Sequence, residues 1–594
     1  MRRTSRCGEI RATDIGKTVT LQGWASSRRD HGGLIFIDLR DRSGIAQIVV
    51  EPDNKDAFAV AEKIRNEFVV EVTGKVRPRP DKMVNPKLPT GQVEVEITSL
   101  IIHNESRPVP FKIVAETEAQ EATEEMRLKY RYLDLRTPER QHALTIRHKA
   151  YQATRSYLTE QEFLEVETPF FVKYTPGGAR NFLVPSRNHQ GSFYALAESP
   201  QIFKQLCMVG GLDRYFQIVR CFRDEDTRKD RQPEFTQIDL EMSFVDEEDV
   251  MSLVEGLMAR IWKDVLGVEI TRPIPRLPWS VAMEKYGVDK PDLRFELPLA
   301  DVTEAARDSD FKVFSETVKN GGVVKCLPIP GKHTLSRSQL DLLPEIVKPY
   351  GAKGVAWVKT SADAWTGPVG KFYTDKTKQD ALLKAAGAQA GDLLLFVADT
   401  FHTANASAGA LRLHMGTLLT LIDEKKWAFT WVYKFPLFEY NAEEKKYVAA
   451  HHPFTSPQPE DLPLLDTDPG KVTARAYDLV LNGTELGGGS IRIHRADIQS
   501  RMFKALSISD EDAQEKFGFL LNAFQYGAPP HGGIAFGMDR LSMLLAGAES
   551  IRDVIAFPKN QSAKDEMTGA PTPISDKQLK DLAIRVVAPE AAKT

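Results

Sequence analysis

Polar side chains recur at every second position of one stretch, RYFQIVRCFRDEDTRKDRQPEFTQIDLE, which spans residues 214–241. Period-two alternation on both sides of the charged centre predicts two strands joined by a loop. Gln237, Asp239 and Glu241 then share one face of the second strand. A sheet does not need such a row for its stability, because buried carboxylates demand partners.

Two interpretations of this hairpin are open from the pattern alone. In the first, it is a solvated hairpin with a charged tip. In the second, its polar face binds a polyphosphate and a charged small molecule. Arg223 would then contact phosphate in bidentate fashion, and Phe235 would stack a base.

A second candidate anion site lies in HGGIAFGMDRLSMLL, residues 531–545. GIAF indicates a strand, Gly537 a turn and Met538 the start of a helix, so Arg540 falls in the first helical turn. Exposed N–H groups and the helix dipole favour an anion at that position.

A third candidate group lies in YDLVLNGTELGGGSIRIH, residues 477–494. Asp478 and Glu485 are placed to share Mg²⁺, a hard cation that takes carboxylate and phosphate oxygens. The glycines between them and Arg492 let a backbone approach a ligand closely. Arg492 is either part of a polar sheet face or a surface arginine on an edge strand.

The composition is that of a globular protein of several domains, with 594 residues, 42% hydrophobic and 27% charged. No apolar run reaches the roughly eighteen residues that a membrane span needs. The four cysteines form no CxxC pair, so neither a zinc ribbon nor a disulfide framework is expected, and the expected location is the cytoplasm. A net charge of −4 means that any nucleic-acid surface must be local.

The elements that would carry an RNA-binding surface come first in the chain. Five strand-like segments before residue 105 predict a small barrel of the oligonucleotide-binding kind. Aromatic and basic residues are interleaved there, as in proteins that hold single-stranded RNA. We expect Trp24 to be barrel core, the commoner fate of an aromatic residue in a strand.

The middle of the chain supplies a connection, a long helix and an insertion. Residues 108–140 form a proline-bearing, acidic hinge, and a helix is predicted over residues 138–160, followed by a strand that breaks at Pro169. Residues 290–425 interrupt the pattern with helices and strands of their own and contain no catalytic constellation.

Taken together, these motifs resemble those of class II aminoacyl-tRNA synthetases. FRDED with RQPEFTQIDLE resembles the second signature, GMDR in its strand–turn–helix setting the third, and the helix with its Pro169 strand the first. The residues of these motifs are most similar to those of bacterial-type aspartyl-tRNA synthetases. The signatures of the other synthetase class, HIGH and KMSKS, and a Rossmann GxGxxG are not seen where they would be needed.

The resemblance implies an α+β fold: an antiparallel class II sheet flanked by helices, an N-terminal OB-fold barrel and an inserted α+β domain. The implied segments are an anticodon-binding OB-fold (1–107), a hinge (108–140), the first catalytic part (141–289), the insertion (290–425), the second catalytic part (426–560) and a C-terminal extension (561–594).

The resemblance also implies roles for individual residues. Arg223 and Arg540 would be catalytic, and Asp478 and Glu485 would hold Mg²⁺. The residues implied for ATP are Arg223, Asp224, Glu225, Gln232, Phe235, Glu485, Gly537, Met538, Asp539 and Arg540. Those implied for L-aspartate are Gln201, Lys204, Arg223, Gln237, Asp239, His451 and Arg492. Those implied for the anticodon are Arg28, Phe36, Gln47 and Arg77.

The activity so implied is that of an aspartate–tRNA ligase, a homodimer that activates L-aspartate with ATP and transfers it to tRNA(Asp). Lys204 and Arg492 at the bottom of a closed pocket suit an acid, because asparagine would leave both cations unpaired. An asparaginyl or other class IIb ligase and a catalytically silent tRNA-binding paralogue are the alternatives. The residues expected to bind phosphate and metal are all present, which favours the ligase.

Two departures from the aspartyl pattern bear on specificity. Gly177 stands where these enzymes usually have a glutamate that contacts the substrate ammonium. His31 stands where tRNA(Asp)-only members tend to have leucine, and Met83 lies near the other position linked to this choice. Our hypothesis is that the enzyme also aspartylates tRNA(Asn).

Overall fold

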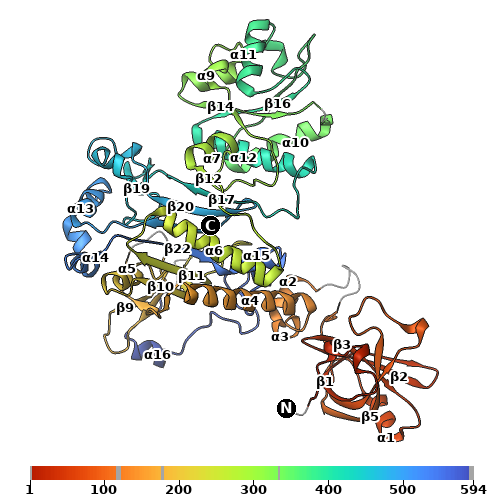
Figure 1. Cartoon of the computed structure of the whole chain (residues 1–594). Coiled ribbons are helices and arrows are strands. Elements are labelled where there is room, and N and C mark those ends of the chain that lie inside the picture. The colour runs from red at the N-terminus through yellow and green to blue at the C-terminus, as the bar shows by residue number, and fades with distance from the viewer. Residues whose placement is uncertain (1–2, 115–121, 176–179, 332, 334, 588–594) are drawn as a thin grey trace. The chain divides into compact units, whose positions relative to one another are not determined.

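The structure is a computed structural model and describes residues 3–114, 122–175, 180–331, 333 and 335–587 (Figure 1). The chain folds into two compact units. One comprises Met1–Lys149, Asp226–Pro233 and Ser542–Leu579, and the other comprises Ala150–Glu225, Glu234–Leu541 and Lys580–Thr594. Gly177 lies outside the described residues.

The first unit contains the predicted barrel. Its strands close in the order β1-β2-β3-β5-β4, with only the β3–β5 pair parallel. Their bounds are β1 (Thr18–His31), β2 (Leu34–Asp41), β3 (Gly44–Val50), β4 (Val69–Pro78) and β5 (Val93–Asn104). Helix α1 (Lys55–Lys63) connects β3 to β4 and begins at Asn54, whose side chain accepts from the Ala57 N–H.

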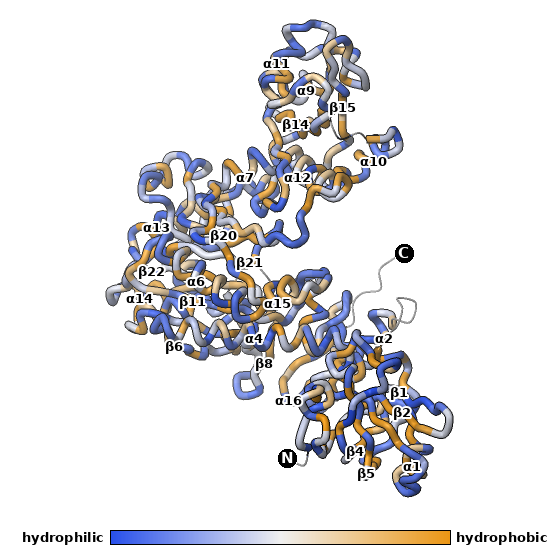
Figure 2. Tube along the Cα trace, turned by 45° about the vertical axis from the view of Figure 1, so that its right-hand side comes forward, coloured by the Kyte–Doolittle hydropathy of each residue, from blue (hydrophilic) through white to orange (hydrophobic). Residues whose placement is uncertain are grey.

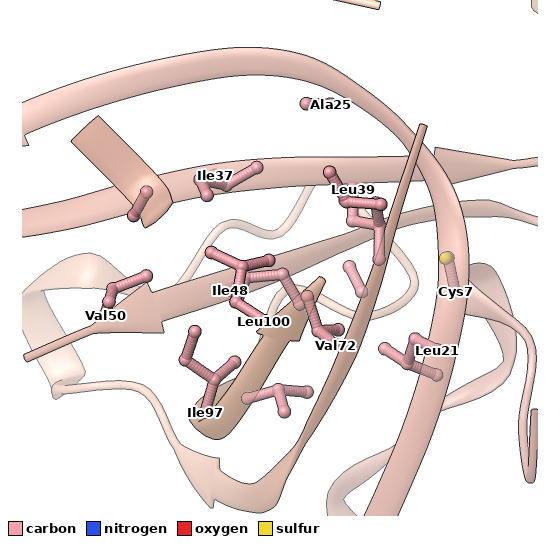
Figure 3. Packing of buried hydrophobic residues seen from close by; sticks show 14 of the residues in the cluster. Cys7, Leu21, Ala25, Ile37, Leu39, Ile48, Val50, Val72, Ile97 and Leu100 are labelled. Atoms are coloured by element: carbon pink, nitrogen blue, oxygen red, sulfur yellow. The ribbon is translucent and has the colours of Figure 1, made fainter. Parts of the chain in front are cut away.

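Alternation along the barrel strands separates a hydrophobic interior from a polar exterior. Leu21, Ile37, Ile48 and Val72 point inward and are fully buried (Figure 3). The expectation that Trp24 joins this core is wrong. Trp24 is half-buried, and the Arg136 guanidinium lies 4.8 Å from its ring centroid. Alternation gives a residue's face but does not say what covers that face.

The first unit also contains helices, and three of them begin where the hinge was expected. It contains α2 (Glu124–Lys129), α3 (Arg131–Asp134), the start of α4 (Pro138–Glu160) and the end of α15 (Met538–Ala546). The segment after α15 includes η9 (Ile551–Asp553) and α16 (Asp576–Asp581), whose last two residues belong to the second unit. The predicted helix over residues 138–160 is confirmed as α4.

The second unit is built on an eight-stranded sheet of order β12-β17-β20-β21-β22-β11-β10-β6. Neighbours from β17 to β10 are antiparallel, and only the edge strands β12 and β6 pair in parallel. The bounds are β6 (Leu164–Glu165), β10 (Arg214–Phe222), β11 (Glu234–Ser243), β12 (Arg276–Pro278), β17 (Phe429–Tyr433), β20 (Ala476–Leu481), β21 (Thr484–Ile491) and β22 (His531–Gly537). The predicted antiparallel sheet is therefore confirmed. Its central strands are largely buried and mix hydrophobic with polar residues (Figure 2).

Helices flank this sheet and hold its strands in place. Helix α5 (Gln201–Val209) packs on β10 and β11, and α6 (Glu247–Leu266) packs on β22. The α6 start is set by an Asp246–Asp249 capping box, and its end by Gly267 in the left-handed conformation. The remaining helices around it are α7 (Trp279–Tyr286), α13 (Ala496–Ala505) and α14 (Asp510–Phe524).

The insertion has a four-stranded sheet of order β13-β14-β16-β15 with separate hydrophobic clusters. Its elements are β13 (Ala300–Asp301), α8 (Thr303–Ala306), α9 (Lys312–Lys319), β14 (Val323–Ile329), α10 (Arg337–Val347), β15 (Ala356–Lys359), α11 (Lys376–Ala386), β16 (Leu393–Asp399) and α12 (Phe401–Leu418). Buried Arg412 donates to the carbonyls of Asp292, Phe295 and Leu297, which pins the entry of the insertion to α12.

Two smaller sheets complete the second unit. They are β7-β9-β8, made of β7 (Phe171–Val172), β8 (Leu183–Pro185) and β9 (Phe193–Leu196), and β18 (Phe438–Asn441) with β19 (Lys446–Ala449). Within the described residues, no helix has both the length and the apolar character needed to cross a membrane.

Candidate active site

Strand β11 carries the polar row that the sequence predicted, and the two carboxylates of the row are buried. Asp239 and Glu241 are 1% and 0% exposed. Lys204, on α5, donates to Asp239 Oδ1 at 2.6 Å and lies 3.2 Å from Glu241 Oε2. The solvated-hairpin interpretation is therefore wrong for this strand, because an isolated charge would not be buried without such partners.

Arg492 meets the same row from a distant part of the chain. It follows β21, is 3% exposed, and contacts Glu241 through Nε at 2.9 Å and Nη2 at 3.2 Å. Its Nη1 donates to Ser490 Oγ at 2.6 Å, and Nη2 donates to the Gly533 carbonyl at 3.3 Å. The alternative of a surface arginine on an edge strand is wrong.

Glu241 is a residue of this cluster that sequence reasoning left out of the site. Lys204 and Arg492 were expected to pair with the substrate carboxylate, and both already lie against the carboxylate of Glu241. The strand alternation already placed Glu241 on the correct face. The sequence could not show that segments 37 and 251 residues away would bring two cations to one carboxylate.

The two carboxylates of the row differ in their protonation. Burial raises the pKa of Asp239 to about 6, even though Lys204 opposes this shift. Burial also acts on Glu241, but Arg492 and Lys204 together lower its pKa to about 2. Asp239 Oδ2 is buried and has no hydrogen-bond partner in the described structure. This oxygen is an acceptor suited to a positively charged ligand group.

A histidine pair borders the cluster, and its second member contacts Arg492. His452 Nε2 lies 2.8 Å from Arg492 Nη1, which can only donate, so Nε2 is the accepting nitrogen. Burial, followed by the nearby Arg492 charge, holds the pKa of His452 well below its ordinary value. His451, the predicted aspartate ligand, lies edge-on to Phe435 with ring centroids 5.1 Å apart.

The predicted glutamines extend the polar network along α5 and β11. Gln201 Nε2 donates to Gln205 Oε1 at 3.2 Å, and Gln205 Nε2 lies 3.2 Å from His531 Nε2. His531 Nδ1 lies 2.7 Å from the Pro529 carbonyl, so Nδ1 carries the proton and Nε2 accepts. Gln237 accepts from the Cys221 thiol at 3.3 Å.

Arg223 lies directly after β10, over the ring of Phe235 on β11. Its guanidinium carbon is 5.0 Å from the ring centroid, and its Nε is buried without a hydrogen-bond partner in the described structure. A buried guanidinium N–H with no acceptor suits an anionic ligand. The neighbouring Asp224 N–H donates to the Arg180 carbonyl at 2.9 Å.

The start of α15 holds the second arginine predicted for ATP, Arg540. The three residues before it, Gly537, Met538 and Asp539, were also predicted for ATP. Arg540 Nη1 donates to the Glu485 carbonyl at 2.6 Å. The Asp539 carboxylate accepts from the Thr236 N–H at 2.8 Å, which ties α15 to β11. Met538 is fully buried in the core, and Gly537 ends β22.

The predicted metal ligands, Asp478 on β20 and Glu485 on β21, flank one glycine. A Cβ atom at Gly488 would lie 2.6 Å from Asp478 Oδ1 and 3.7 Å from Glu485 Oε1. Burial, then repulsion from Glu485, raises the pKa of Asp478 well above its usual range. Among the described residues no group of three metal-binding side chains occurs, so a cation here would need further oxygens from a ligand. Two carboxylates with unbalanced charge fit Mg²⁺ bound to phosphates.

Gln232, predicted for ATP, lies in the segment Asp226–Pro233 of the first unit. Its side-chain amide makes two hydrogen bonds with the Lys559 backbone, at 3.1 and 2.8 Å. Glu225, the last residue before this segment, is half-buried.

The predicted anticodon residues lie on the barrel, where the pairing of β2 with β3 brings two of them to one face. Phe36, paired with Val49, and Gln47, paired with Asp38, share the outer face of β2 and β3. Arg77, on β4, is bound by Glu51 at 2.7 Å and Glu94 at 2.9 Å.

Arg28 is not on that face. It pairs with inward-facing Ile37, and its Nε donates to the Ala61 carbonyl at 3.0 Å. Arg29 pairs with Phe36 instead and lies beside it, while the implied role of Arg28 in anticodon binding stays a prediction. A β-bulge between Ala25 and Ser27 shifts the alternation of β1, so the sequence pattern could not show which of the two arginines shares the face of Phe36.

The two residues linked to tRNA choice lie on different loops of the barrel. The His31 ring lies 6.4 Å from the Phe36 ring, at the tip of the β1–β2 hairpin. Met83 is 55% exposed on η3 (Asp81–Met83), between β4 and β5.

Comparison with known proteins agrees with this architecture. Residues 123–561 match the family described as tRNA synthetases class II (D, K and N), and residues 19–102 match the OB-fold nucleic acid binding domain. The chain is 54% identical to the aspartate–tRNA(Asp/Asn) ligase of Syntrophotalea carbinolica and 55% identical to the aspartate–tRNA ligase of Bacillus licheniformis, with 98% of each chain covered in both cases.

Solved structures show the same fold at lower identity. The asparaginyl-tRNA synthetase of Pyrococcus horikoshii, complexed with asparaginyl-adenylate, aligns with a TM-score of 0.58 at 20% identity, covering 94% of this chain and 98% of its own. The chain therefore belongs to the class II tRNA synthetases of the D, K and N family, and it is an aminoacyl-tRNA synthetase.

Proposed function

We propose that the protein is an aspartate–tRNA ligase, which joins L-aspartate to the 3′ end of tRNA(Asp) at the expense of ATP. The observation that carries the proposal is the buried cluster of Lys204, Asp239, Glu241 and Arg492. The names of the relatives at 54–55% identity support the same amino acid.

The cluster can hold both ends of a small dicarboxylic amino acid. Asp239 Oδ2, the buried acceptor without a partner, would take the α-ammonium group. Lys204 and Arg492, held by Glu241, would take the side-chain carboxylate. Asparagine presents a neutral amide and would lose the charge-assisted hydrogen bonds to both cations.

Arg223 and Arg540 would bind the triphosphate, with Phe235 beneath the adenine. An oxygen of the α-carboxylate of aspartate attacks the α-phosphorus of ATP, the bond from that phosphorus to the oxygen bridging to the β-phosphate breaks, and pyrophosphate leaves. The 3′-hydroxyl of the terminal tRNA adenosine then attacks the aspartyl carbonyl and AMP leaves. The rate enhancement comes from positioning of the two substrates and from fixed positive charge, since no protein nucleophile takes part.

Asp478 and Glu485 would hold Mg²⁺, which neutralises phosphate charge when bound. Gly488 leaves room for this contact because it has no side chain between the two carboxylates. The two residues thereby orient the triphosphate without contacting the amino acid.

The barrel would bind the anticodon through the face that carries Phe36 and Gln47, with tRNA(Asp) as the partner. The Asp/Asn names of several relatives, and His31 beside Phe36, support tRNA(Asn) as a second partner. The proposal includes the cytoplasm as location and the six segments predicted from the sequence.

A homodimer is part of the same proposal. The small sheet β7-β9-β8 exposes a cluster of large apolar side chains, with Phe171 and Tyr194 in ring contact at 5.6 Å. These side chains are 43–58% exposed and comprise Phe171, Leu183, Phe193 and Tyr194. Exposed apolar surface of this kind suits a subunit interface.

Aspartate-dependent ATP–pyrophosphate exchange tests the proposal. Arg223→Ala removes the guanidinium over Phe235 and should reduce exchange by about a thousandfold or more, the scale of losing a charge stabiliser of the transition state. Arg337→Ala, at an arginine whose side chain is 88% exposed in the insertion, is the matched control and should exchange normally. Near-normal exchange by Arg223→Ala would overturn the assignment, and a wild-type protein without exchange would favour a silent paralogue.

A further inference from the structure

A network of charged side chains joins the barrel to the helices that follow it within the first unit. Arg136 lies between α3 and α4, and its Nη1 donates to Glu67 Oε2 at 2.8 Å. Its guanidinium carbon also lies 4.8 Å from the ring centroid of Trp24 on β1, a cation–π contact. Trp24 and Glu67, the latter in the turn before β4, both belong to the barrel. One side chain of the helical segment therefore contacts two parts of the barrel.

The carboxylate of Glu67 is shared with a second arginine. Arg40, on β2, donates through Nη2 to the same oxygen of Glu67 at 2.8 Å and through Nη1 to Ser26 Oγ at 3.3 Å. Arg40 and Glu67 are each 4% exposed, whereas the Arg136 side chain is 26% exposed. A buried carboxylate needs a cation, and Arg40 already supplies one from within the barrel. The barrel therefore does not need Arg136 to neutralise Glu67, and the second ion pair serves the junction with the helices.

The backbone at Glu67 has a conformation that few residues adopt. Its φ is 66°, in the left-handed region, which is unfavourable for a residue other than glycine. Two hydrogen bonds hold this turn against β1: the Glu67 N–H donates to the Ala25 carbonyl at 2.7 Å, and the Ala25 N–H donates to the Phe68 carbonyl at 2.9 Å. Such a conformation persists only where its surroundings fix it. The carboxylate is therefore presented to Arg136 at one defined position.

The network starts on the strand that carries Phe36, the aromatic residue predicted for the anticodon. Phe36 and Arg40 alternate with the buried Ile37 and Leu39, so they share the outer face of β2. At the other end of the network, Arg136 precedes α4, which continues from the first unit into the second. The outer face of β2 thus connects the predicted anticodon surface, through Glu67, to the residues that lead into α4.

We propose that Arg136 is a positioning residue that holds the barrel on the helices leading into α4, so that recognition of the anticodon raises the rate of aspartyl transfer. The inference rests on the proposed function, because it concerns the tRNA step of that reaction. Arg136 is not assigned to a substrate, since its guanidinium is already engaged by Glu67 and the Trp24 ring. A firmly held barrel presents the bound tRNA in one orientation, whereas a loosely held one would bind the same anticodon in many unproductive orientations.

The first test is aspartylation of tRNA(Asp) by Arg136→Ala. We expect kcat to fall about tenfold or more with KM little changed, the scale of losing one charge-assisted hydrogen bond. Aspartate-dependent ATP–pyrophosphate exchange needs no tRNA and should equal that of the wild type. Arg136→Lys keeps a cation for Glu67 and loses the flat contact with Trp24, so it should recover part of the lost rate.

Anticodon dependence distinguishes positioning from a general structural role. In the wild type, replacing the middle anticodon base of tRNA(Asp) should raise KM and lower kcat. In Arg136→Ala the replacement should still raise KM, because the barrel still binds the base, but it should change kcat much less. An unchanged kcat with normal tRNA(Asp), an equal effect of the replacement on kcat in both proteins, or a parallel loss of exchange would overturn the proposal.

Arg260→Ala is the matched control. The Arg260 side chain is 32% exposed and bonds to Glu160 and Asp264 within the second unit, so it resembles Arg136 in exposure and in having acidic partners. This variant should charge both tRNAs as the wild type does. If the wild type shows no aspartate-dependent exchange, the proposed function fails, and tryptic cleavage after the exposed Lys112 still tests the junction. Faster cleavage in Arg136→Ala would show that Arg136 holds the barrel, and unchanged cleavage would refute this.

Discussion

Two carboxylates on one strand, equally buried, behave differently because of their neighbours. Glu241 lies against both Lys204 and Arg492, and its pKa falls to about 2. Burial raises the pKa of Asp239 to about 6, because the opposing Lys204 charge offsets only part of the effect and Glu241 adds repulsion. Glu241 is therefore a permanent counter-ion that holds the cations in place, whereas Asp239 is a titratable acceptor.

This difference predicts the pH dependence of aspartate binding. Below a pH of about 6, Asp239 becomes protonated and cannot accept a charge-assisted bond from the substrate ammonium. The KM for aspartate in the exchange reaction should rise up to about tenfold per pH unit below this value and be flat from about pH 7 to 8. A KM that is constant down to pH 5 would contradict the role of Asp239.

The raised pKa of Asp239 also determines how the stability of the fold depends on pH. The folded chain holds the Asp239 proton up to a pH of about 6, whereas the unfolded chain releases it near 3.8, so this group's contribution to stability falls as pH rises through that window. Glu241, with its pKa lowered from 4.5 to about 2, contributes stability that is present above 4.5 and lost as pH falls toward 2.

At this scale the sequence predicted most side chains of the cluster but not their pairing. Alternation placed Asp239 and Glu241 on one face, and the resemblance added Lys204 and Arg492. The contact of His452 with Arg492 could not be read from the sequence, because the two adjacent histidines give no signal of which one turns toward the cluster. That choice depends on tertiary packing.

Among the elements, β21 determines how the two metal-binding candidates meet. Gly488 pairs with Asp478 on one side and with Ala535 on the other. This part of β21 therefore lies between β20, which carries Asp478, and β22. A side chain at this position has no space of its own, because its first carbon would contact Asp478 Oδ1 at 2.6 Å.

Gly488→Ala should therefore damage the ATP step more than the fold. We expect exchange to fall about a hundredfold and the half-saturating Mg²⁺ concentration to rise, because the Asp478 carboxylate must shift to admit the new methyl group. Gly354→Ala, where a Cβ meets nothing within 4 Å, is the control and should behave as wild type. An unchanged Mg²⁺ dependence in Gly488→Ala would argue against this metal site.

The barrel strands, β10, β11 and α4 were predictable because each has two unlike faces and a clear period. Strand order was not, since β22 lies between β21 and β11, which are distant in sequence. Trp24 was misplaced for a related reason: Arg136, which lies over its ring, comes from another segment of the chain.

For the whole molecule, the barrel and the amino-acid cluster belong to separate units, so tRNA selection and amino-acid selection can be changed independently. The wild-type protein should aspartylate purified tRNA(Asn) as well as tRNA(Asp). His31→Leu should lower kcat/KM for tRNA(Asn) about tenfold and leave exchange unchanged, because His31 lies beside Phe36 and is exposed. Failure of the wild type to charge tRNA(Asn) would refute the dual specificity and leave the ligase assignment intact.

The central claim is that Lys204, Asp239, Glu241 and Arg492 form one site for a dicarboxylic amino acid. Comparing aspartate with asparagine in ATP–pyrophosphate exchange by the wild-type protein tests it most directly. We predict exchange with aspartate and at least about a thousandfold lower kcat/KM with asparagine, because the amide leaves two buried cations without a charged partner from the substrate. Equal exchange with both amino acids, or a preference for asparagine, would contradict the account.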